Sequence, residues 1–365
     1  MNLSFNKDDN VIHIHCASHG EYLLAKKLII NLKDKFKNHK FLLSFISPSG
    51  YENADEDLFD CIIFLPLASE KNCVKFYNII NPTATFFIKN EIWPNFIRHA
   101  KMNGSKVYSI GGNFKFSFLK KIIKINSAIK SFDSIYVLNE KSKKVIENIG
   151  NKNVSVCGDL RFDADIPKLK KYTSNIINRF IDNKFCIVFG STWKEDEDLI
   201  IKYINNSKRK IKYIIAPHEI LKNSERIKNQ LGAKCILFSK IKSTTNLNEF
   251  SCVVIDNIGM LSSLYSYCTI AYVGGGMGVK GLHNTIEPAH FSKPIIIGKN
   301  YNEFDEAKEM IKNGNMKSIS NYKGFIHTIE SIIDNKKLRQ EMSNKCTEYF
   351  NKNRGAVKLI LNNLK

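Results

Sequence analysis

Short apolar runs alternate with amphipathic stretches along the chain. In the first half, seven apolar runs predict buried strands, at residues 11–18, 41–47, 61–67, 84–89, 106–112, 134–139 and 154–159. Between several of them lie segments such as GEYLLAKKLIINLKDKF and EKSKKVIENIG, in which apolar residues recur with helical spacing. This alternation of strands and helices favours an α/β fold with a parallel sheet covered by helices on both faces.

The pattern changes to a polar, lysine-rich helical segment without a clear strand at residues 161–183, and a second series of apolar runs follows it. These runs predict six further strands, at residues 185–191, 211–217, 234–239, 252–256, 269–275 and 294–298. We therefore expect two Rossmann-like domains facing each other across a cleft, and ligands of such sheets bind beyond the carboxyl ends of the strands. The expected parts are an N-terminal domain, a linker, a C-terminal domain and a C-terminal helix that packs back on the N-terminal domain (1–165, 166–183, 184–345 and 346–365).

The net charge is the unusual feature of the composition. The chain has 365 residues, of which 43% are hydrophobic and 25% charged, as in ordinary globular proteins, but its formal net charge is +20. The lysines are scattered rather than gathered in a tail. Such a charge favours an anionic partner, which can be a nucleic acid, an anionic membrane surface or a phosphorylated substrate. Signatures of nucleic-acid-binding domains are missing from the sequence, so a basic nucleic-acid-binding protein is the less favoured class.

Cysteine usage and hydropathy predict a cytoplasmic protein. The nine cysteines occur singly, without C-x-x-C or metal-finger spacing, as is typical of thiols in a reducing compartment. The chain opens with the polar MNLSFNKDDN, and its apolar runs are shorter than the roughly 20 residues that span a bilayer. We therefore expect no transmembrane helix. Motifs such as H-E-x-x-H and D-x-D are also missing, so we expect no metal and no cofactor.

A glycine-rich loop, VGGGMGVKGLHNTIEPA at residues 273–289, follows one of the predicted strands. Glycine permits positive φ and close approach of a ligand to the backbone. A strand, a glycine turn and a helix N-terminus together favour anions, because backbone N–H groups and the helix dipole point at them. The loop therefore predicts a nucleotide phosphate site, although its spacing is neither G-x-G-x-x-G nor that of a P-loop.

Two glutamates follow strands of the first series. Glu21 stands at the start of a helix in HCASHGEYLLAKKLI, and Glu91 follows the strand ATFFIK in KNEIWPNFI. Glu21 can simply complement its helix N-terminus, which is worth about 0.3–1 kcal/mol. The functional interpretation makes Glu21 a general base aimed into the cleft. Glu91 would then orient the acceptor or stabilise developing positive charge.

Polar residues also follow strands of the second series. Ser191 and Thr192 in GSTWKEDED can cap a helix, or their hydroxyl and N–H groups can bind a phosphate or carboxylate. His218 in APHEI follows the next predicted strand, and a lone histidine is more often satisfied locally than catalytic.

Taken in order, these motifs resemble those of the Kdo transferases, GT-B glycosyltransferases that move 3-deoxy-D-manno-octulosonic acid (Kdo) from CMP-Kdo to the lipid A precursor. The matching segments are HCASHGE, SPSGYE, KNEIWPN, GDLRFD, GSTW, IAPHEI, DNIGMLSSLY and VGGGMGVKGLHNTIEPA, which cover nearly the whole chain from Val11 to the C-terminal helix. The form IAPHEI is most similar to Bacteroidetes-type members.

The resemblance implies roles for individual residues. It implies that Glu21 is the catalytic base that deprotonates a sugar hydroxyl of the lipid acceptor, and that Glu91 supports the acceptor site. It also implies an inverting reaction without an obligatory metal. The donor-binding residues that it implies surround the phosphate and carboxylate, the cytosine, and the remainder of the CMP moiety with Glu287 at the ribose (Ser191, Thr192, His218, Met260, Gly275, Gly276, Gly281, His283, Asn284 and Glu287).

Two departures from the family pattern matter. Family members typically carry an N-terminal membrane-anchoring helix, where this sequence has ten polar residues before the first strand. Many relatives also have Pro-Arg-His where this chain has Pro217, His218 and Glu219. We expect a protein peripheral to the cytoplasmic face of the inner membrane, held there by basic residues. Another GT-B sugar-nucleotide enzyme, such as an epimerase, is the nearest alternative.

Overall fold

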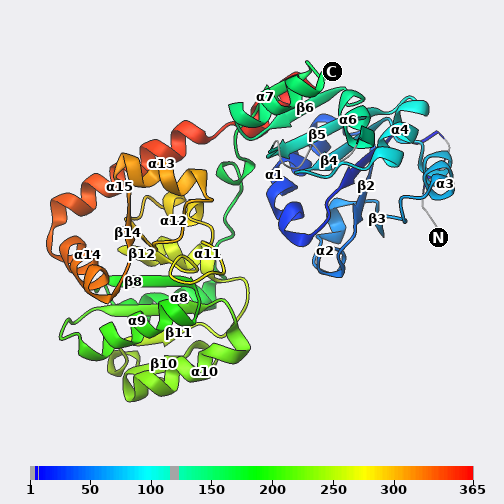
Figure 1. The fold of residues 1–365 in the computed structure, drawn as a ribbon. Coiled ribbons are helices and arrows are strands. Elements are labelled where there is room, and N and C mark those ends of the chain that lie inside the picture. Colours follow the sequence, from blue (N-terminus) through cyan, green and yellow to red (C-terminus); the bar gives the residue numbers. More distant parts are fainter. Residues whose placement is uncertain (1–4, 7, 116–122, 365) are drawn as a thin grey trace. The chain divides into compact units, whose positions relative to one another are not determined.

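The computed structural model describes residues 5–364 except residue 7 and residues 116–122, so the opening residues 1–4 and part of the lysine-rich segment near residue 120 lie outside the described chain. The chain divides into two compact units (Figure 1). Unit 1 comprises residues 1–165 and 353–365, and unit 2 comprises residues 166–352. Each unit is described by itself.

Unit 1 is built on a parallel seven-stranded sheet in the order β3-β2-β1-β4-β5-β6-β7. Its helices cover both faces, as the alternating pattern predicts. The strands are β1 Val11–His15, β2 Lys40–Phe45, β3 Cys61–Phe64, β4 Ala84–Ile88, β5 Lys106–Gly112, β6 Ser134–Val137 and β7 Val154–Val156. The helices are α1 His19–Lys35, α2 Pro48–Glu52, α3 Glu70–Ile80, α4 Pro94–Met102, α6 Ile123–Lys130, α7 Glu140–Ile149 and α16 Ala356–Asn363.

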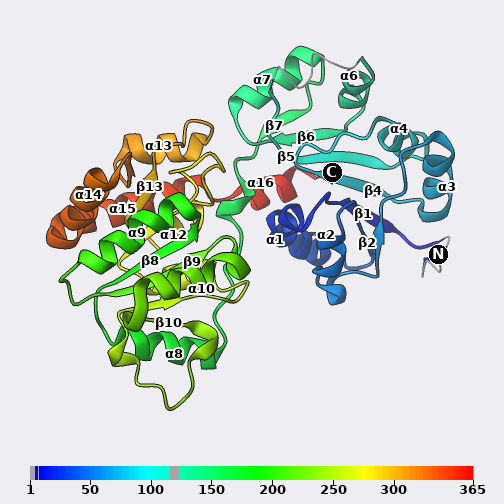
Figure 2. The same cartoon turned by 60° about the horizontal axis from the view of Figure 1, so that its bottom comes forward.

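The C-terminal helix α16 packs in unit 1 although it follows unit 2 in the sequence. It lies against α1 (Figure 2) and buries Val357 and Ile360 in the same core as the apolar face of α1. Asp163 accepts hydrogen bonds from the N–H groups of Gly355 and Val357, both at 2.8 Å, which satisfies donors at the start of the helix. At its other end, the Lys35 ammonium donates to a carbonyl oxygen of the last turn.

Unit 2 has a second parallel seven-stranded sheet, in the order β10-β11-β9-β8-β12-β13-β14. Its strands are β8 Cys186–Thr192, β9 Lys212–Pro217, β10 Cys235–Leu237, β11 Cys252–Val254, β12 Ile270–Val273, β13 Ile295–Gly298 and β14 Met316–Ile319. Its helices are α8 Lys171–Ile181, α9 Lys194–Asn206, α10 Ile220–Leu231, α11 Leu261–Leu264, α12 Ile286–His290, α13 Asp305–Asn313, α14 Tyr322–Asp334 and α15 Lys336–Asn353.

Unit 2 differs from the sequence prediction at three places. The segment 166–183 contains a helix, α8, in line with its helical pattern, but this helix belongs to unit 2 rather than to a separate linker: Phe180 is fully buried, and the Lys212 ammonium lies 4.7 Å from the centre of its ring. Strand β14 is short and carries only two buried residues, so its pattern gives no strand signal. Helix α15 extends the unit to residue 352, beyond the predicted boundary at 345.

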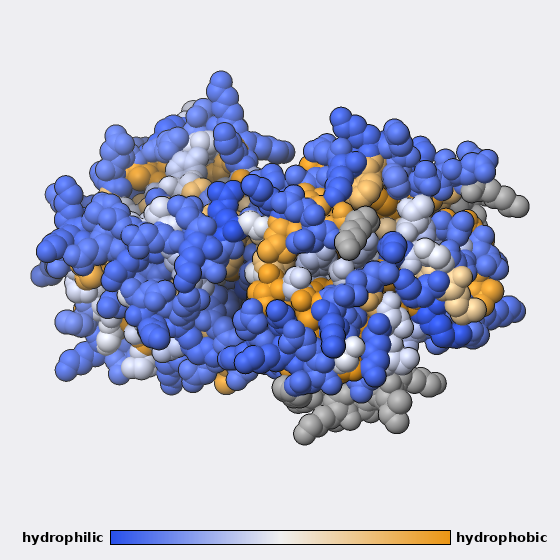
Figure 3. Space-filling model, turned by 90° about the horizontal axis from the view of Figure 1, so that it is seen from above, coloured by the Kyte–Doolittle hydropathy of each residue, from blue (hydrophilic) through white to orange (hydrophobic). Residues whose placement is uncertain are grey.

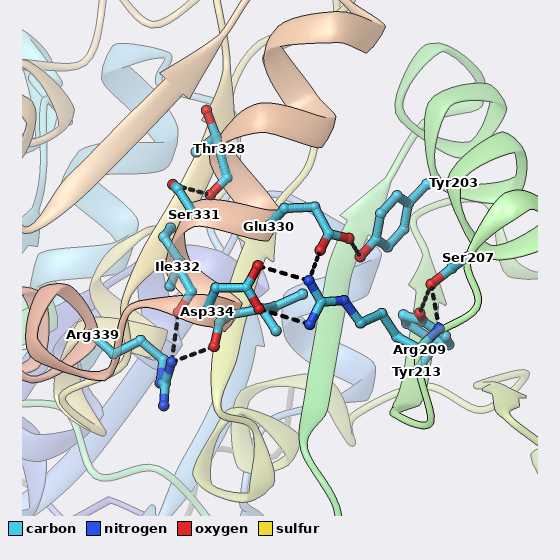
Figure 4. A network of polar contacts seen from close by, with 11 residues as sticks. Tyr203, Ser207, Arg209, Tyr213, Thr328, Glu330, Ser331, Ile332, Asp334 and Arg339 are labelled. Carbon is cyan, nitrogen blue, oxygen red and sulfur yellow. Dashed lines mark hydrogen bonds and ion pairs between the residues drawn. The ribbon is translucent and has the colours of Figure 1, made fainter.

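An arginine joins the loop after α9 to α14 (Figure 4). The guanidinium of Arg209 donates two hydrogen bonds to Asp334, each at 2.7 Å, and another to Glu330. The other carboxylate oxygen of Glu330 accepts a bond from Tyr203 Oη at 2.6 Å. These bonds connect α9 and the loop that follows it to α14.

Among the described residues, each helix is either too short or too polar to span a bilayer.

Candidate active site

The carboxyl ends of β1 and β4 place Glu21 and Glu91 at the same edge of the first sheet, because the two strands are parallel neighbours. Glu21 lies in the first turn of α1, and its Oε2 accepts a hydrogen bond of 2.6 Å from the N–H of Ala17. The glutamate therefore does satisfy a donor at the helix N-terminus. That role and a role in catalysis are compatible, because a carboxylate can accept several hydrogen bonds.

Glu91 is held by two aromatic side chains. Its Oε2 accepts a hydrogen bond of 2.7 Å from Trp93 Nε1 and lies 3.6 Å from Nε2 of the fully buried His15. The Glu91 side chain is 20% exposed, so one side of the carboxylate remains open to a ligand.

The two carboxyl groups have pKa values displaced in opposite directions. Burial raises the pKa of Glu21, and the negative charge of Glu91 raises it further, against the opposing effects of the Ala17 N–H, Lys89 and His15. Burial also acts to raise the pKa of Glu91, but His15 and the Trp93 N–H outweigh it, so the pKa of Glu91 is lowered. Glu91 therefore ionises first, and Glu21 is the better proton acceptor.

Exposed apolar side chains lie at the carboxyl ends of β2 and β3, beside the glutamate pair. Tyr51 and Phe64 stack with ring centres 4.6 Å apart, and both are more than 40% exposed. Ile46 follows β2 and Leu67 follows β3, with exposed fractions of 46% and 83%. Figure 3 shows apolar patches within a mostly hydrophilic surface. The sequence does not reveal the exposure of these four side chains, because apolar residues after a strand look the same whether they are buried or exposed.

In unit 2, the glycine-rich loop packs closely against protein backbone. A Cβ on Gly275 would lie 2.0 Å from the carbonyl oxygen of Gly281, and Gly275 has φ of +91°. A Cβ on Gly276 would lie 3.0 Å from the backbone of Gly298, at the end of β13. At both positions, protein backbone occupies the space that a side chain would need. Gly281 also has positive φ, +93°, but its Cβ position is less crowded, with Phe304 at 3.7 Å.

Asp196 anchors this loop, a function that the sequence did not reveal. Its fully buried carboxylate accepts hydrogen bonds from the N–H groups of Gly275 and Trp193, at 2.8 and 3.0 Å, and from Tyr272 Oη at 2.7 Å. Burial raises the pKa of Asp196. In the sequence, Asp196 is one of several acids in the first turn of a helix, so no local signal separates it from them.

Three aromatic rings stack beside the loop. Trp193 lies on His218 with ring centres 4.5 Å apart, and His218 is also 4.5 Å from the ring of His283. Trp193 Nε1 donates a hydrogen bond of 2.9 Å to Nε2 of His283. Burial, together with the neighbouring His218, lowers the pKa of His283 to about 4. Lys280 Nζ lies 5.3 Å from the centre of the Trp193 ring, so a positive charge lies beside the stacked rings.

A pocket of about 550 Å³ opens at the carboxyl ends of β8, β9 and β11. Ser191 and His218 line it, as do Gly259 and Leu261 on either side of Met260, which itself is buried. Ser191 has φ of +51°.

Thr192, the other hydroxyl of the GSTW motif, turns away from the pocket. Its side chain is fully buried, and its hydroxyl donates to Glu197 Oε1 at 3.1 Å. The Thr192 hydroxyl is thus engaged within the protein, and its contact with a donor stays a prediction. Strand β8 continues to Thr192, with an irregularity in its pairing with β9 between Gly190 and Thr192.

Asn284 and Glu287 lie together at the start of α12. Asn284 Nδ2 donates a hydrogen bond of 3.2 Å to Glu287 Oε1, and its Oδ1 accepts from the N–H of Ile286 at 3.0 Å. The predicted donor-binding residues of the glycine loop thus occur in one part of unit 2. Within the described residues, no group of three or more His, Cys, Asp or Glu side chains is arranged to hold a metal.

The fold is shared with solved structures of an epimerase and a glycosyltransferase. A UDP-GlcNAc 2-epimerase from Neisseria meningitidis, bound to UDP-GlcNAc, aligns with a TM-score of 0.68 and 16% identity over 97% of this chain and 98% of its own. A glycosyltransferase from Rickettsia africae aligns with a TM-score of 0.63 and 13% identity over 97% of each chain. Two parallel-sheet units with these neighbours define an α/β protein of the GT-B fold, as the sequence predicts.

Sequence comparison identifies the family that this chain resembles. Residues 2–164 match the family model of 3-deoxy-D-manno-octulosonic-acid transferase (kdotransferase). The 3-deoxy-D-manno-octulosonic acid transferase of Rickettsia typhi is 27% identical over 92% of this chain and 74% of its own length, and that of Aquifex aeolicus is 26% identical over 89% and 86%. These matches confirm the resemblance to the Kdo transferases, which are glycosyltransferases.

One further relative is longer than this chain. A bifunctional glycosyltransferase/methyltransferase of Fusobacterium nucleatum is 26% identical over 98% of this chain, which spans 59% of that protein.

Proposed function

We propose that this protein is an inverting glycosyltransferase that moves Kdo from CMP-Kdo to a lipid A precursor (lipid IVA), a step in lipopolysaccharide core biosynthesis. The observation that carries the proposal is the pair of carboxylates at one edge of the first sheet, with the pKa of Glu21 raised and that of Glu91 lowered. The matches to Kdo transferases supply the reaction class.

In the proposed reaction, Glu21 accepts the proton of an acceptor hydroxyl as its oxygen attacks the anomeric carbon of Kdo. The new C–O bond forms on the face opposite the phosphate, and the bond from the anomeric carbon to the phosphate oxygen of CMP breaks. The configuration at that carbon is therefore inverted. Glu91, ionised and fixed by Trp93 and His15, orients the acceptor and stabilises positive charge that develops at the sugar.

The donor is proposed to bind in unit 2. Ser191 and His218 line the pocket where the phosphate and carboxylate of CMP-Kdo would lie, and Lys280 adds a positive charge nearby. The remaining donor contacts are assigned by resemblance to residues of the glycine loop and its surroundings, with Glu287 at the ribose (Met260, Gly275, Gly276, Gly281, His283, Asn284 and Glu287). CMP-Kdo serves as a substrate, and the proposal includes no cofactor.

The acceptor is proposed to be lipid-anchored at the cytoplasmic face of the inner membrane. Exposed Tyr51, Phe64, Ile46 and Leu67 beside the glutamate pair suit an acceptor with apolar tails. Each lysine near an anionic leaflet contributes about 1 kcal/mol at best, so several on one face would hold a protein of charge +20 at that surface. If binding to vesicles depended little on salt and on anionic lipid, this part of the proposal would be wrong.

The experiment that tests the proposal is product analysis by mass spectrometry. The protein is incubated with CMP-Kdo and tetraacylated lipid A precursor, and in parallel with UDP-GlcNAc. We expect the mass of the lipid to rise by one or more Kdo residues, with no epimerised UDP sugar. If the folded protein epimerises UDP-GlcNAc and leaves the lipid unchanged, the epimerase alternative is correct.

A further inference from the structure

Strand β1 carries two histidines on a face that otherwise belongs to the apolar core. His13 and His15 are separated by one residue, so their side chains point to the same face of the sheet, and both are fully buried. His13 packs against Phe76, with ring centres 5.1 Å apart, and His15 packs against Phe87 at 5.9 Å. Two imidazoles in such surroundings cost free energy unless hydrogen bonds compensate for the lost water.

Ser44 on the neighbouring strand supplies those hydrogen bonds. It pairs with His15 in the register of β1 and β2, and its Oγ lies 2.9 Å from Nδ1 of His15 and 2.8 Å from Nε2 of His13. A hydroxyl has one proton to donate, and within the described residues the Ser44 hydroxyl has no acceptor other than the two rings, so one ring accepts from Ser44 and the other donates to it. The three side chains therefore form a directed chain of hydrogen bonds.

The two outer ring nitrogens, Nε2 of His15 and Nδ1 of His13, decide which ring donates to Ser44 and which ring accepts from it. At one end, His15 Nε2 is buried without a hydrogen bond and lies 3.6 Å from the carboxylate of Glu91. At the other end, Nδ1 of His13 is buried without a partner. If His15 carried its proton on Nδ1, a lone pair on Nε2 would face the carboxylate, and His13 would bury an unpaired N–H. With the proton on Nε2, His15 directs an N–H at Glu91 instead, and Ser44 donates to Nδ1.

We propose that His15 and Ser44 are positioning residues: Ser44 fixes the tautomer of His15 so that its Nε2–H faces Glu91 and, with Trp93, holds that carboxylate in place. This inference rests on the proposed function for its catalytic consequence, but the tautomer and the contact are properties of the protein alone. His15 reaches Glu91 from β1, whereas Trp93 reaches it from the segment before α4, so the carboxylate is held from two elements.

Other ionisable groups lie around the two glutamates. Lys89 lies near Glu21 and lowers its pKa, and the buried Cys16 thiol lies near both glutamates. Burial raises the pKa of Cys16 far above its ordinary value, so that thiol remains neutral. The ionisable groups that surround His15 and the two glutamates are thus His13, Lys89 and Cys16.

Nitrogen-15 NMR of the histidine rings tests the tautomer directly, without any substrate. We expect His15 to be the pure Nε2–H form in the wild-type protein and a mixture of tautomers in Ser44→Ala. A wild-type His15 protonated on Nδ1, or an unchanged pure tautomer in Ser44→Ala, would overturn the proposal. The signal of His15 is assigned by its loss in His15→Asn.

Two substitutions of His15 test the contact with Glu91. The amide of Gln can reach the position of Nε2, whereas the shorter Asn retains only the position of Nδ1, next to Ser44. Since the chain has two tryptophans, the Trp93 indole N–H can be followed alone in a Trp193→Phe background. We expect His15→Asn to shift or broaden this signal and His15→Gln to leave it nearly unchanged, with the exposed Glu140→Gln as control. Equal effects of Asn and Gln would argue against a role through Nε2.

The kinetic consequence is measured in the Kdo transfer assay. We expect kcat to fall about tenfold in His15→Asn, because the Nε2–H that faces the Glu91 carboxylate is lost, with the KM for the donor unchanged and with recovery in His15→Gln. If the NMR results hold and the wild-type protein transfers no Kdo, the proposed function fails and the positioning of Glu91 stands. If transfer occurs and both variants keep full kcat, the positioning role is wrong.

Discussion

Glu21 and Glu91 come from two adjacent strand ends, and the negative charge of Glu91 is one of the causes that raise the pKa of Glu21. The same two residues differ in their hydrogen bonds: Glu21 accepts from one backbone N–H, whereas Glu91 lies between Trp93 and His15. In the proposed reaction, Glu91 is the carboxylate that stays charged and fixed, and Glu21 is the one that takes the proton.

The pH dependence of Kdo transfer should follow Glu21. A general base acts when it is ionised, so activity rises with pH through the raised pKa of Glu21. In Glu91→Gln the charge that raises this pKa is gone. We expect the acidic limb of kcat/KM to move to lower pH, although the maximal rate falls. An acidic limb at the same pH in both proteins would show that Glu91 does not act on the base.

The stability of unit 1 should depend on His13. Burial, with a smaller effect of His15, lowers the pKa of His13 to about 3. The pKa of His13 in the folded protein lies below the unfolded value of 6.5, so the unfolded state takes up the proton first. The contribution of His13 to the free energy of unfolding is therefore complete above pH 6.5 and is lost as the pH falls toward 3. Between pH 7 and 4.5 we expect a loss of roughly 2–3 kcal/mol that His13→Leu does not show.

Denaturant unfolding followed by Trp93 fluorescence, in a Trp193→Phe background, measures this difference. His13→Leu also removes the hydrogen bond to Ser44, which changes stability at every pH. The quantity to compare is therefore the change of the free energy of unfolding with pH in the two proteins. Parallel pH profiles for the two proteins would rule out a buried neutral His13 as the cause.

Two glycines of unit 2 provide a matched test of backbone packing. Gly275 and Gly259 both have positive φ, at +91° and +87°, but a Cβ on Gly275 would meet the Gly281 carbonyl oxygen at 2.0 Å, and a Cβ on Gly259 has open space. We expect Gly259→Ala to cost about 1 kcal/mol, from its φ alone. Gly275→Ala should cost roughly 3 kcal/mol or more, because overpacking adds to the strain. Unfolding monitored by Trp193 in a Trp93→Phe background distinguishes them, and equal costs would mean that the loop readily shifts.

The hydrogen bond from Trp193 to His283 should matter for donor binding. Trp193→Phe keeps an aromatic ring on His218 but removes the indole N–H that His283 accepts. A neutral hydrogen bond contributes about 1 kcal/mol, so we expect the Kd for CMP to rise about fivefold with kcat little changed. Isothermal titration calorimetry with CMP measures the first quantity. An unchanged Kd would place the nucleotide away from this stack.

Much of this architecture follows from the pattern of the sequence, because apolar runs of strand length separated by amphipathic helices have few other solutions. Glu21 and Glu91 were identified for the same reason, since the ends of parallel neighbouring strands meet at one edge. Ser44 could not be identified, because its contacts depend on the register between β1 and β2. The sequence also does not reveal that the Thr192 side chain is buried and donates a hydrogen bond to Glu197.

The central claim is that Glu21 takes the proton of the acceptor. The most direct measurement is the single-turnover rate of Kdo transfer, with both substrates saturating, for the wild-type protein, Glu21→Gln and the surface control Glu140→Gln. The account predicts that Glu21→Gln is slower by about 100-fold or more, with CMP binding unchanged, and that Glu140→Gln matches the wild type. A folded Glu21→Gln protein that transfers Kdo within a few-fold of the wild-type rate would contradict it.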